Sequence, residues 1–148
     1  MERTLMIIKP DGVKKRIIGE ILRRVEGIGL TVKCVKMLQL DRSTAKRFYL
    51  VHRERPFFHS LVEYMTSGPV VVVALEGPNA VNRYRTLIGA TNPDKADEGT
   101  IRRLYGDSIE INTVHGSDSS ENGLIETAFF FSSAELEMTN SLSEDEIQ

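Results

Sequence analysis

Several features that would assign a chain to a familiar class are missing from this sequence. Its 148 residues include one cysteine, Cys34, which excludes an intrachain disulfide and a metal site built from several cysteines. No apolar run reaches the roughly 18 to 20 residues that a membrane-spanning helix needs. The N-terminal stretch MERTLMIIKPDGV predicts a strand and a turn rather than a secretory signal. We therefore expect a cytoplasmic protein without a membrane segment.

The usual signatures of nucleotide and metal sites are missing as well. Neither a Walker-type GxxxxGK[ST] motif nor a glycine-rich GxGxxG loop occurs. The three histidines, His52, His59 and His115, lack the close pairing with Cys or carboxylates that a zinc site requires. If nucleotides bind, another scheme must hold them, and Mg2+ would be held mainly by phosphates and water.

The charged residues of the sequence do not form long runs of one sign. The formal net charge is -2, but five of the 21 acidic residues lie in the last fourteen positions, which leaves 16 acids against 19 Lys and Arg elsewhere. Dispersed cations suit a small anionic ligand at least as well as nucleic acid, and we expect no nucleic-acid partner. We divide the chain into a single domain, residues 1–137, and an acidic, disordered tail, residues 138–148.

Hydrophobic patterns predict strands at residues 3–9, 30–40 and 69–77 and a short strand before His115. The run of four valines in 70–73 has no polar alternation and should be buried on both faces. Helical patterns lie at residues 18–29, 42–54, 58–68, 79–89 and 121–131. This order predicts an α+β fold of ferredoxin-like βαββαβ type, a mainly antiparallel four-stranded sheet covered by helices on one face.

Local signals refine the predicted helices. Asn79 is expected to cap the helix at 79–89, and Asp118 or Ser119 the last one. In the last helix Leu124, Ile125, Ala128 and Phe129 share one face, while Gly123 weakens the helix. By periodicity alone, Glu126 points away from that face and should be solvent-exposed.

The stretch NTVHGSD places His115 after a short strand and before a helix. Imidazole is an uncharged nucleophile near neutral pH and a good leaving group once phosphorylated, although a structural, hydrogen-bonded histidine is the simpler interpretation. Gly116 would allow close approach of a ligand and an unusual backbone angle. Lys9 ends the first strand before the turn PDG, where it is either a strand-edge cation or an ordinary exposed lysine.

Two further stretches suit a nucleotide. The segments ATNP (90–93) and EGTIRR (98–103) bracket a loop whose hydroxyls and cations fit phosphate oxygens, namely those of Thr91, Thr100, Arg102 and Arg103. RPFF (55–58) places two phenylalanines after a proline. Such pairs usually belong to a core, but an exposed one could stack on a base.

Taken together, these segments resemble one family. NTVHGSD is similar to the Asn-x-x-His-Gly-Ser-Asp signature of nucleoside diphosphate kinases. IIKPDGV, RPFF, SGPVVVVALEG, GATNP and GTIR stand in that family's order and approximate spacing, from about Arg3 to Phe131. The resemblance, closer to bacterial than to animal members, implies Mg2+-dependent transfer of the terminal phosphate of a nucleoside triphosphate, mainly ATP, to a nucleoside diphosphate. It also implies ping-pong kinetics, a ferredoxin-like core and a homo-oligomer built from dimers.

The resemblance also implies roles for individual residues. His115 would be the phosphorylated nucleophile, with Ser117 and Glu126 supporting its ring, so the resemblance overrules the exposed position that periodicity gives Glu126. Phe57 and Ile109 would sandwich the base, with Leu61 beside them. The positions that would hold phosphates and sugar hydroxyls are those of Lys9, Tyr49, Arg85, Thr91, Arg102 and Asn112.

Departures from the family pattern concern assembly more than chemistry. Glu98 stands where many members have proline, in a loop that often lies at subunit contacts, so tetramer and hexamer both stay open. Two other functions are compatible with the fold: a catalytically inactive nucleotide-binding or scaffold module, and a histidine phosphocarrier fed by a partner protein. The first has no need of His115, and the second needs neither a base clamp nor the cations Lys9, Arg85 and Arg102.

Overall fold

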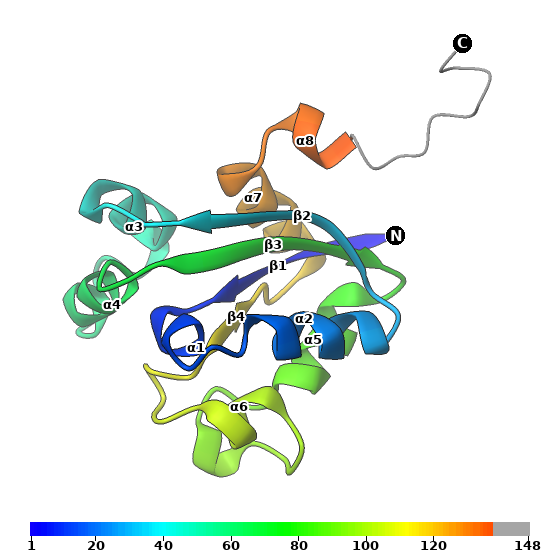
Figure 1. The fold of residues 1–148 in the computed structure, drawn as a ribbon. Helices are drawn as coiled ribbons and strands as arrows, with labels where there is room; N and C mark the ends of the chain where they lie inside the picture. The colour runs from blue at the N-terminus through cyan, green and yellow to red at the C-terminus, as the bar shows by residue number, and fades with distance from the viewer. Residues whose placement is uncertain (138–148) are drawn as a thin grey trace.

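The structure is a computed structural model that describes residues 1–137. Its sheet has four strands in the order β2-β3-β1-β4, and every neighbouring pair is antiparallel (Figure 1). The strands are β1 (Glu2–Ile8), β2 (Thr31–Leu38), β3 (Val70–Gly77) and β4 (Val114–Gly116). This arrangement confirms the predicted α+β sandwich. The expected acidic tail, 138–148, lies outside the described residues.

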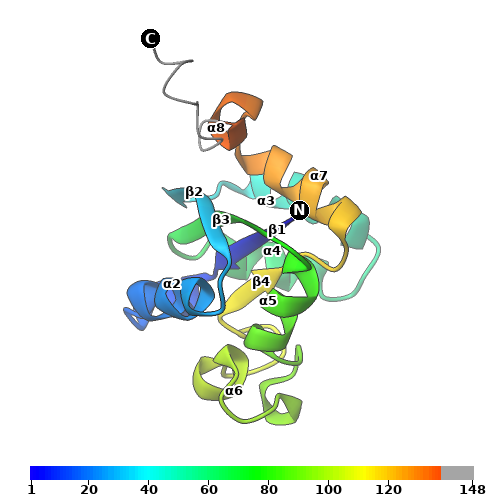
Figure 2. The ribbon, with the colours of Figure 1, turned by 90° about the vertical axis from the view of Figure 1, so that its right-hand side faces the viewer.

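Helices cover both faces of the sheet, so the expectation that they cover one face was wrong (Figure 2). One core cluster joins Leu5 and Ile7 of β1 to α3, α4, α7 and α8, and the other joins Met6 and Ile8 to α2 and α5. The helices are α1 (Pro10–Lys14), α2 (Ile18–Gly27), α3 (Arg42–Phe48), α4 (Phe58–Met65), α5 (Ala80–Ile88), α6 (Ile101–Tyr105), α7 (Ser120–Phe130) and α8 (Ser133–Glu137), with short 3-10 helices η1 (Leu50–His52) and η2 (Pro93–Lys95).

The central strands explain why two layers of helix are needed. Residues Leu5 to Ile8 are fully buried, and Val70 to Val73 are at most 3% exposed, as predicted for the valine run. Successive side chains of a strand point to opposite faces, so a strand that is apolar throughout needs cover on both. Burying each such side chain stabilises the fold by about 1.5–3 kcal/mol.

Three predicted helix features differ from the structure. The helix expected at 42–54 ends at Phe48 and gives way to η1. The PDG turn is the start of α1, with Pro10 in the first turn, where a missing N–H costs nothing. Part of the expected phosphate loop is α6, whose first turn is capped by the Thr100 hydroxyl accepting from Arg103 N.

The caps were predicted with mixed success. Ser119 does cap α7, since its hydroxyl accepts a hydrogen bond from Asn122 N at 3.0 Å. Asn79 is the N-cap residue of α5, as predicted, but it has a left-handed conformation, φ 52°, and its side chain makes no capping bond. Asparagine tolerates this conformation better than most residues, which accounts for its place there.

The face that α7 turns to the sheet was also predicted wrongly. Leu124, Ile125 and Phe129 are 57%, 60% and 37% exposed, whereas Gly123, Thr127 and Phe130 face the sheet. A Cβ added at Gly123 would overlap the carbonyl oxygen of Arg3. The helix therefore packs on β1 through its smallest residue, and Glu126 is rotated toward β4.

Candidate active site

His115 lies on the edge strand β4, opposite Ile7 of β1. Its side chain is 19% exposed, and its Nε2 lies 2.7 Å from Oε1 of Glu126. Phe48 meets the ring edge-on, with 5.7 Å between ring centroids, and the Tyr84 hydroxyl donates to the His115 carbonyl at 2.8 Å. No hydrogen bond engages Nδ1 among residues 1–137. The ring is held through one nitrogen and leaves the other free.

Glu126 is held in turn by Ser117. The fully buried Ser117 hydroxyl donates to Glu126 Oε1 at 2.7 Å and accepts from Leu5 N at 3.0 Å. One carboxylate oxygen thus meets both the imidazole and a hydroxyl fixed to the sheet backbone. Such a partner fixes both the tautomer and the orientation of a histidine. Glu126 is half-buried, so the exposed position that periodicity gave it was wrong.

Lys9 and Asn112 form a buried pair beside the histidine strand. Lys9 is 8% exposed and Asn112 2%, and Nζ donates to Oδ1 at 2.9 Å. The Asn112 amide donates to the carbonyls of Thr91 (3.1 Å) and Ile109 (2.9 Å), which ties two loops together. Burial, with the charge of Arg102, lowers the pKa of Lys9 from 10.5 to about 8. Lys9 is therefore not the exposed lysine of the simpler interpretation.

Arg102 is a second buried cation. It is 7% exposed, and its guanidinium donates to the carbonyls of Gly89 at 3.0 Å and Val114 at 2.8 Å. Its Nε is buried without a hydrogen-bond partner in the described part of the chain, and burial lowers the pKa of the group. Arg85 on α5 approaches the Ser117 carbonyl at 3.5 Å. Cations from three elements thus meet around β4, and within residues 1–137 none of the three forms a salt bridge to a carboxylate.

Two hollows open next to these residues. One, of about 440 Å³, is lined by Tyr49, His52, His115 and Glu126 among others. The other, of about 590 Å³, is lined by Arg85 and Thr91. Tyr49 is buried, its hydroxyl has no partner among the described residues, and burial followed by the charge of Glu126 raises its pKa. Arg102 lines neither hollow, and its Nε is buried.

The residues predicted to hold a base, and the phenylalanine beside them, differ in how far they are exposed. Phe57 is 45% exposed at the N-cap of α4, and Ile109 is 60% exposed in the loop before Asn112. Phe58 and Leu61, in contrast, belong to the core. The RPFF pair is therefore split into one core ring and one exposed ring.

Sequence reasoning missed a second layer of residues. Asp11 accepts hydrogen bonds from the hydroxyls of Thr113, at 2.9 Å, and Tyr64. Thr113 has a positive φ of 77°, an unusual value for a β-branched residue. The unusual backbone angle was expected at Gly116, which has none. Gly116 instead admits Tyr84, whose ring carbon would lie 2.8 Å from an added Cβ.

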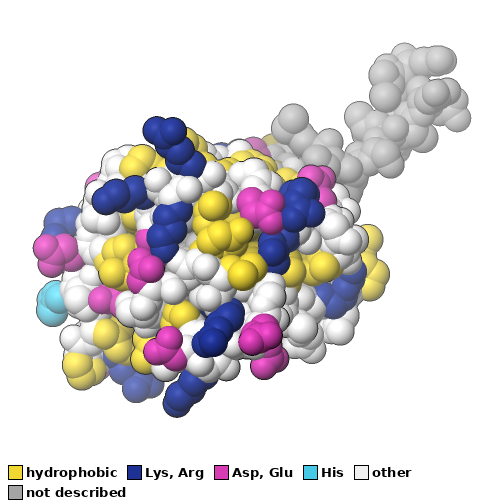
Figure 3. Space-filling view, turned by 60° about the horizontal axis from the view of Figure 1, so that its bottom comes forward, with side chains coloured by type: hydrophobic (Ala, Val, Ile, Leu, Met, Phe, Trp, Pro, Cys, Tyr) yellow, Lys and Arg dark blue, Asp and Glu magenta, His cyan; other side chains and the backbone are white. Residues whose placement is uncertain are grey.

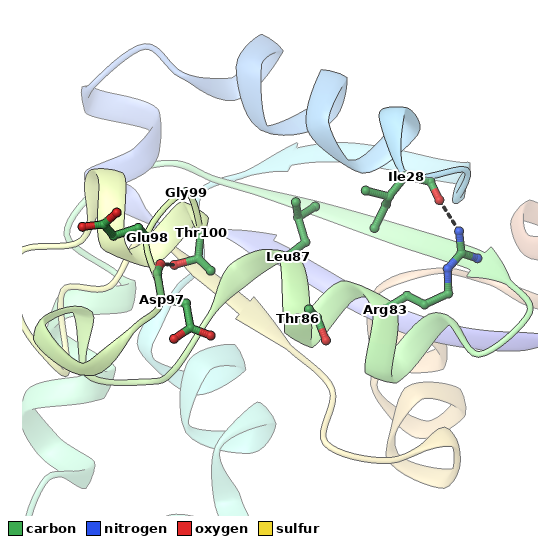
Figure 4. Close-up of a pocket in the computed structure, with 8 residues that line it drawn as sticks. All are labelled: Ile28, Arg83, Thr86, Leu87, Asp97, Glu98, Gly99 and Thr100. Atoms are coloured by element: carbon green, nitrogen blue, oxygen red, sulfur yellow. Dashed lines mark hydrogen bonds between the residues drawn. The ribbon is translucent and has the colours of Figure 1, made fainter.

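A hollow of about 580 Å³ lies elsewhere, between the end of α2, α5 and the loop 97–100 (Figure 4). Its walls hold Leu87 and Thr86, with Asp97 and Glu98 toward one end. Arg83 closes the other end and is committed to the Ile28 carbonyl. Apart from Thr100, a candidate for the phosphate loop, none of the predicted site residues lines it, although it shares Thr86 and Asp97 with the hollow of Arg85 and Thr91.

Within residues 1–137, no three His, Cys, Asp or Glu side chains gather as a metal-ligand group. Of the helices in the same range, none combines the length and apolarity required to span a bilayer. The His115 region offers instead a free ring nitrogen, a carboxylate behind the ring and cations around it. These groups can accept a phosphoryl group and stabilise its charge.

Comparison with known proteins agrees with this chemistry. Residues 2–136 match the family model for nucleoside diphosphate kinase. The chain is 58% identical to the nucleoside diphosphate kinase of Wolinella succinogenes, over 92% of this chain and 99% of that protein, and 57% identical to that of Chlamydia pneumoniae, over 92% and 94%. The crystal structure of the Aquifex aeolicus nucleoside diphosphate kinase superposes with a TM-score of 0.88 at 44% identity, covering 90% of this chain and 97% of that one.

Proposed function

The chain belongs to the nucleoside diphosphate kinase family, and from this premise we propose how its own residues carry out the reaction. The protein transfers the terminal phosphate of a nucleoside triphosphate to a nucleoside diphosphate through a phosphohistidine intermediate, by a ping-pong mechanism. An inactive scaffold module is not favoured, because the family's members at this level of identity are named as kinases.

His115 is the nucleophile in this proposal. Since Nε2–H donates to Glu126, the lone pair stays on Nδ1. Nδ1 attacks the γ-phosphorus, the bond from that phosphorus to the β-γ bridging oxygen breaks, and the diphosphate leaves with the electron pair. Glu126 balances the positive charge that develops on the ring. A terminal oxygen of a second nucleoside diphosphate then attacks the phosphorus, the N–P bond breaks, and its electron pair returns to the imidazole.

Lys9, Arg85 and Arg102 stabilise the charge of the transferring phosphoryl group, since phosphoryl transfer depends mainly on position and electrostatics. Within residues 1–137 none of these three cations forms a salt bridge to a carboxylate, which leaves their charge for the phosphate and supports this assignment. Thr91 and Tyr49 hold sugar and phosphate oxygens. Asn112 has both amide hydrogens committed to carbonyls, so it serves a sugar hydroxyl through the remaining lone pair of Oδ1. Few base-edge contacts are needed if Phe57 and Ile109 clamp the ring of the base, and any base offers a face to stack on.

The family's reaction requires a divalent cation, and the residues around His115 suit one that arrives on the nucleotide. Their charged side chains are mostly cationic, and cations repel a bare metal but attract a metal-phosphate complex. We assign Mg2+ to the phosphates and water. When bound, it neutralises phosphate charge and polarises the bridging oxygen.

In this proposal the protein assembles as a homo-oligomer built from dimers. It acts in the cytoplasm, where its nucleotide substrates are found. Strand β2 is a sheet edge of 8 residues, with Val35 48% and Met37 58% exposed. Such an edge invites pairing with another chain. Two copies of β2 paired antiparallel would cover both residues, and such a dimer is compatible with either a tetramer or a hexamer.

The observation that carries this assignment is the 2.7 Å contact of His115 Nε2 with Glu126. To test it, the purified protein is incubated with γ-labelled ATP and Mg2+ without acceptor. We expect label that is lost in acid, survives base and is discharged by GDP as labelled GTP. His115→Ala should bind nucleotide, take no label and lose on the order of 10³-fold or more in turnover. Nucleotide binding without labelling of the wild type would favour the inactive module.

A further inference from the structure

The backbone between Asn112 and Val114 makes a tight turn of an uncommon kind. Val114 N donates to the Asn112 carbonyl at 2.9 Å, a bond that spans one residue, and the central residue Thr113 has φ 77°. These are the marks of a γ-turn with positive φ, which is rare and strained. β-branched residues resist this conformation most, and they keep it only where surrounding contacts enforce it.

Contacts on three sides enforce the turn at Thr113, which is fully buried. Its carbonyl accepts from Lys9 N at 2.8 Å, and its hydroxyl donates to Asp11 Oδ2 at 2.9 Å. A Cβ added at Gly12 would lie 3.2 Å from Thr113 Cγ2, so α1 packs closely against the turn. Of these contacts, the bond to Asp11 is the one that requires a hydroxyl on the side chain, whereas the Cγ2 contact requires only a methyl group.

The carboxylate of Asp11 is itself anchored on its other oxygen. The Tyr64 hydroxyl donates to Oδ1, and Asp11 N donates back to that hydroxyl at 3.2 Å. Tyr64 is in α4, the helix that Phe57 precedes. The chain of contacts therefore runs from the helix beside Phe57, through Asp11, to the turn between Asn112 and His115.

We propose that Asp11 and Thr113 are positioning residues for the phosphoryl transfer: their hydrogen bond holds the strained turn that places Asn112, and Asn112 in turn directs the Lys9 ammonium toward the phosphate. The turn can influence the reaction because residues on both sides of it, Asn112 and His115, belong to the site. Asn112 accepts from Lys9 Nζ at 2.9 Å, and His115 follows one residue after Val114. The inference rests on the proposed function and adds two residues to it.

Substitutions at Thr113 separate positioning from packing. Valine keeps the shape but loses the hydroxyl, so the turn should relax and misplace Asn112. Glycine leaves a cavity but adopts positive φ without strain, so it needs no tether. Serine keeps the hydroxyl. If Thr113 only filled space, valine would be harmless and glycine the most damaging.

The experiment measures phosphohistidine formation in a single turnover at saturating ATP, with thermal unfolding recorded for each variant. We expect Thr113→Val to lower the rate about 10- to 100-fold, as for the loss of a hydrogen bond to a charged group, with Thr113→Ser and Thr113→Gly recovering most of it. Asp11→Ala should slow the wild type comparably but cost little further in the Thr113→Gly background.

Rates that follow thermal stability, with valine like wild type and glycine slowest, would overturn the inference. So would an Asp11→Ala loss of equal size in the Thr113→Gly background. A failure of the proposed function looks different, because the wild type itself would then take no label from ATP.

Discussion

The reactivity of His115 depends on side chains that come from other elements of the fold. Glu126 lies eleven residues on, in another element, yet it meets the ring at 2.7 Å while Phe48 faces it edge-on. A carboxylate behind one nitrogen raises the electron density at the other and fixes its direction. Lys9 and Arg102 are buried cations beside the same strand, and they keep the surroundings attractive to phosphate.

Removing the charge behind the ring should slow the reaction without weakening substrate binding. We expect Glu126→Gln to lower the single-turnover rate of histidine phosphorylation by on the order of 10- to 100-fold, the size of effect typical of losing a charged hydrogen-bond partner. The KM for ATP should change little. Rapid quench with labelled ATP measures both values, and a raised KM at an unchanged rate would contradict the role assigned to Glu126.

Lys9 predicts a particular dependence on pH. It attracts phosphate only when protonated, and its pKa in the free protein is lowered from 10.5 to about 8. The contribution of Lys9 to kcat/KM should therefore be fully present well below pH 8, be halved near that value and be lost as the pH rises through it. Lys9→Arg keeps its charge in this range, so its profile should lack the alkaline fall, whatever its absolute rate. A wild-type profile that stays flat up to about pH 10, near the ordinary lysine pKa, would exclude the assignment.

At the scale of elements, α7 shows how one small residue sets the orientation of a helix. The apolar residues Leu124, Ile125 and Phe129 predicted the buried face, but the sheet is met by Gly123. Close approach at that point turns Glu126 toward Ser117 and His115. The packing of this helix is thus part of the site's geometry.

A methyl group at position 123 should test that packing. Alanine is favoured over glycine within a helix by about 1 kcal/mol, yet here its Cβ would overlap the Arg3 carbonyl oxygen. We expect Gly123→Ala to reduce the free energy of unfolding in urea by about 1–3 kcal/mol. Gly19→Ala is the matched control, because nothing lies within 4 Å of a Cβ there, and it should be neutral or stabilising. Equal behaviour of the two variants would refute the close approach.

At the scale of the whole molecule, the sheet separates two hydrophobic cores. One core lies between the sheet and helices α2 and α5. The other lies on the opposite face, beneath α3, α4, α7 and α8 (Figures 1 and 2). On the face that Figure 3 shows, basic and acidic side chains are interspersed with apolar ones. The coloured residues of this face form no large patch of a single charge. Within residues 1–137, the edge strand β2 has no strand on its outer side.

Charging the β2 edge should separate the subunits. We expect Val35→Lys with Met37→Lys to shift the oligomer to a smaller species in size-exclusion chromatography with light scattering, because lysines on an edge oppose strand pairing. Leu124→Lys, at an apolar position 57% exposed on α7, is the control and should leave the mass unchanged. An unchanged mass for the β2 variant would move the interface elsewhere.

The sequence by itself determined the sheet, the valine-rich central strand and the order of the elements, because periodicity and apolar runs report how each segment is buried. The motif around His115 and its collinear neighbours determined the family. Only the tertiary structure decided that helices cover both faces, that α7 turns Glu126 inward, and that Asp11, Tyr64 and Thr113 join across the site. These outcomes depend on contacts between segments that are far apart in the sequence; Asp11 and Thr113, for example, are over a hundred residues apart. A local sequence pattern does not report which distant atoms come into contact.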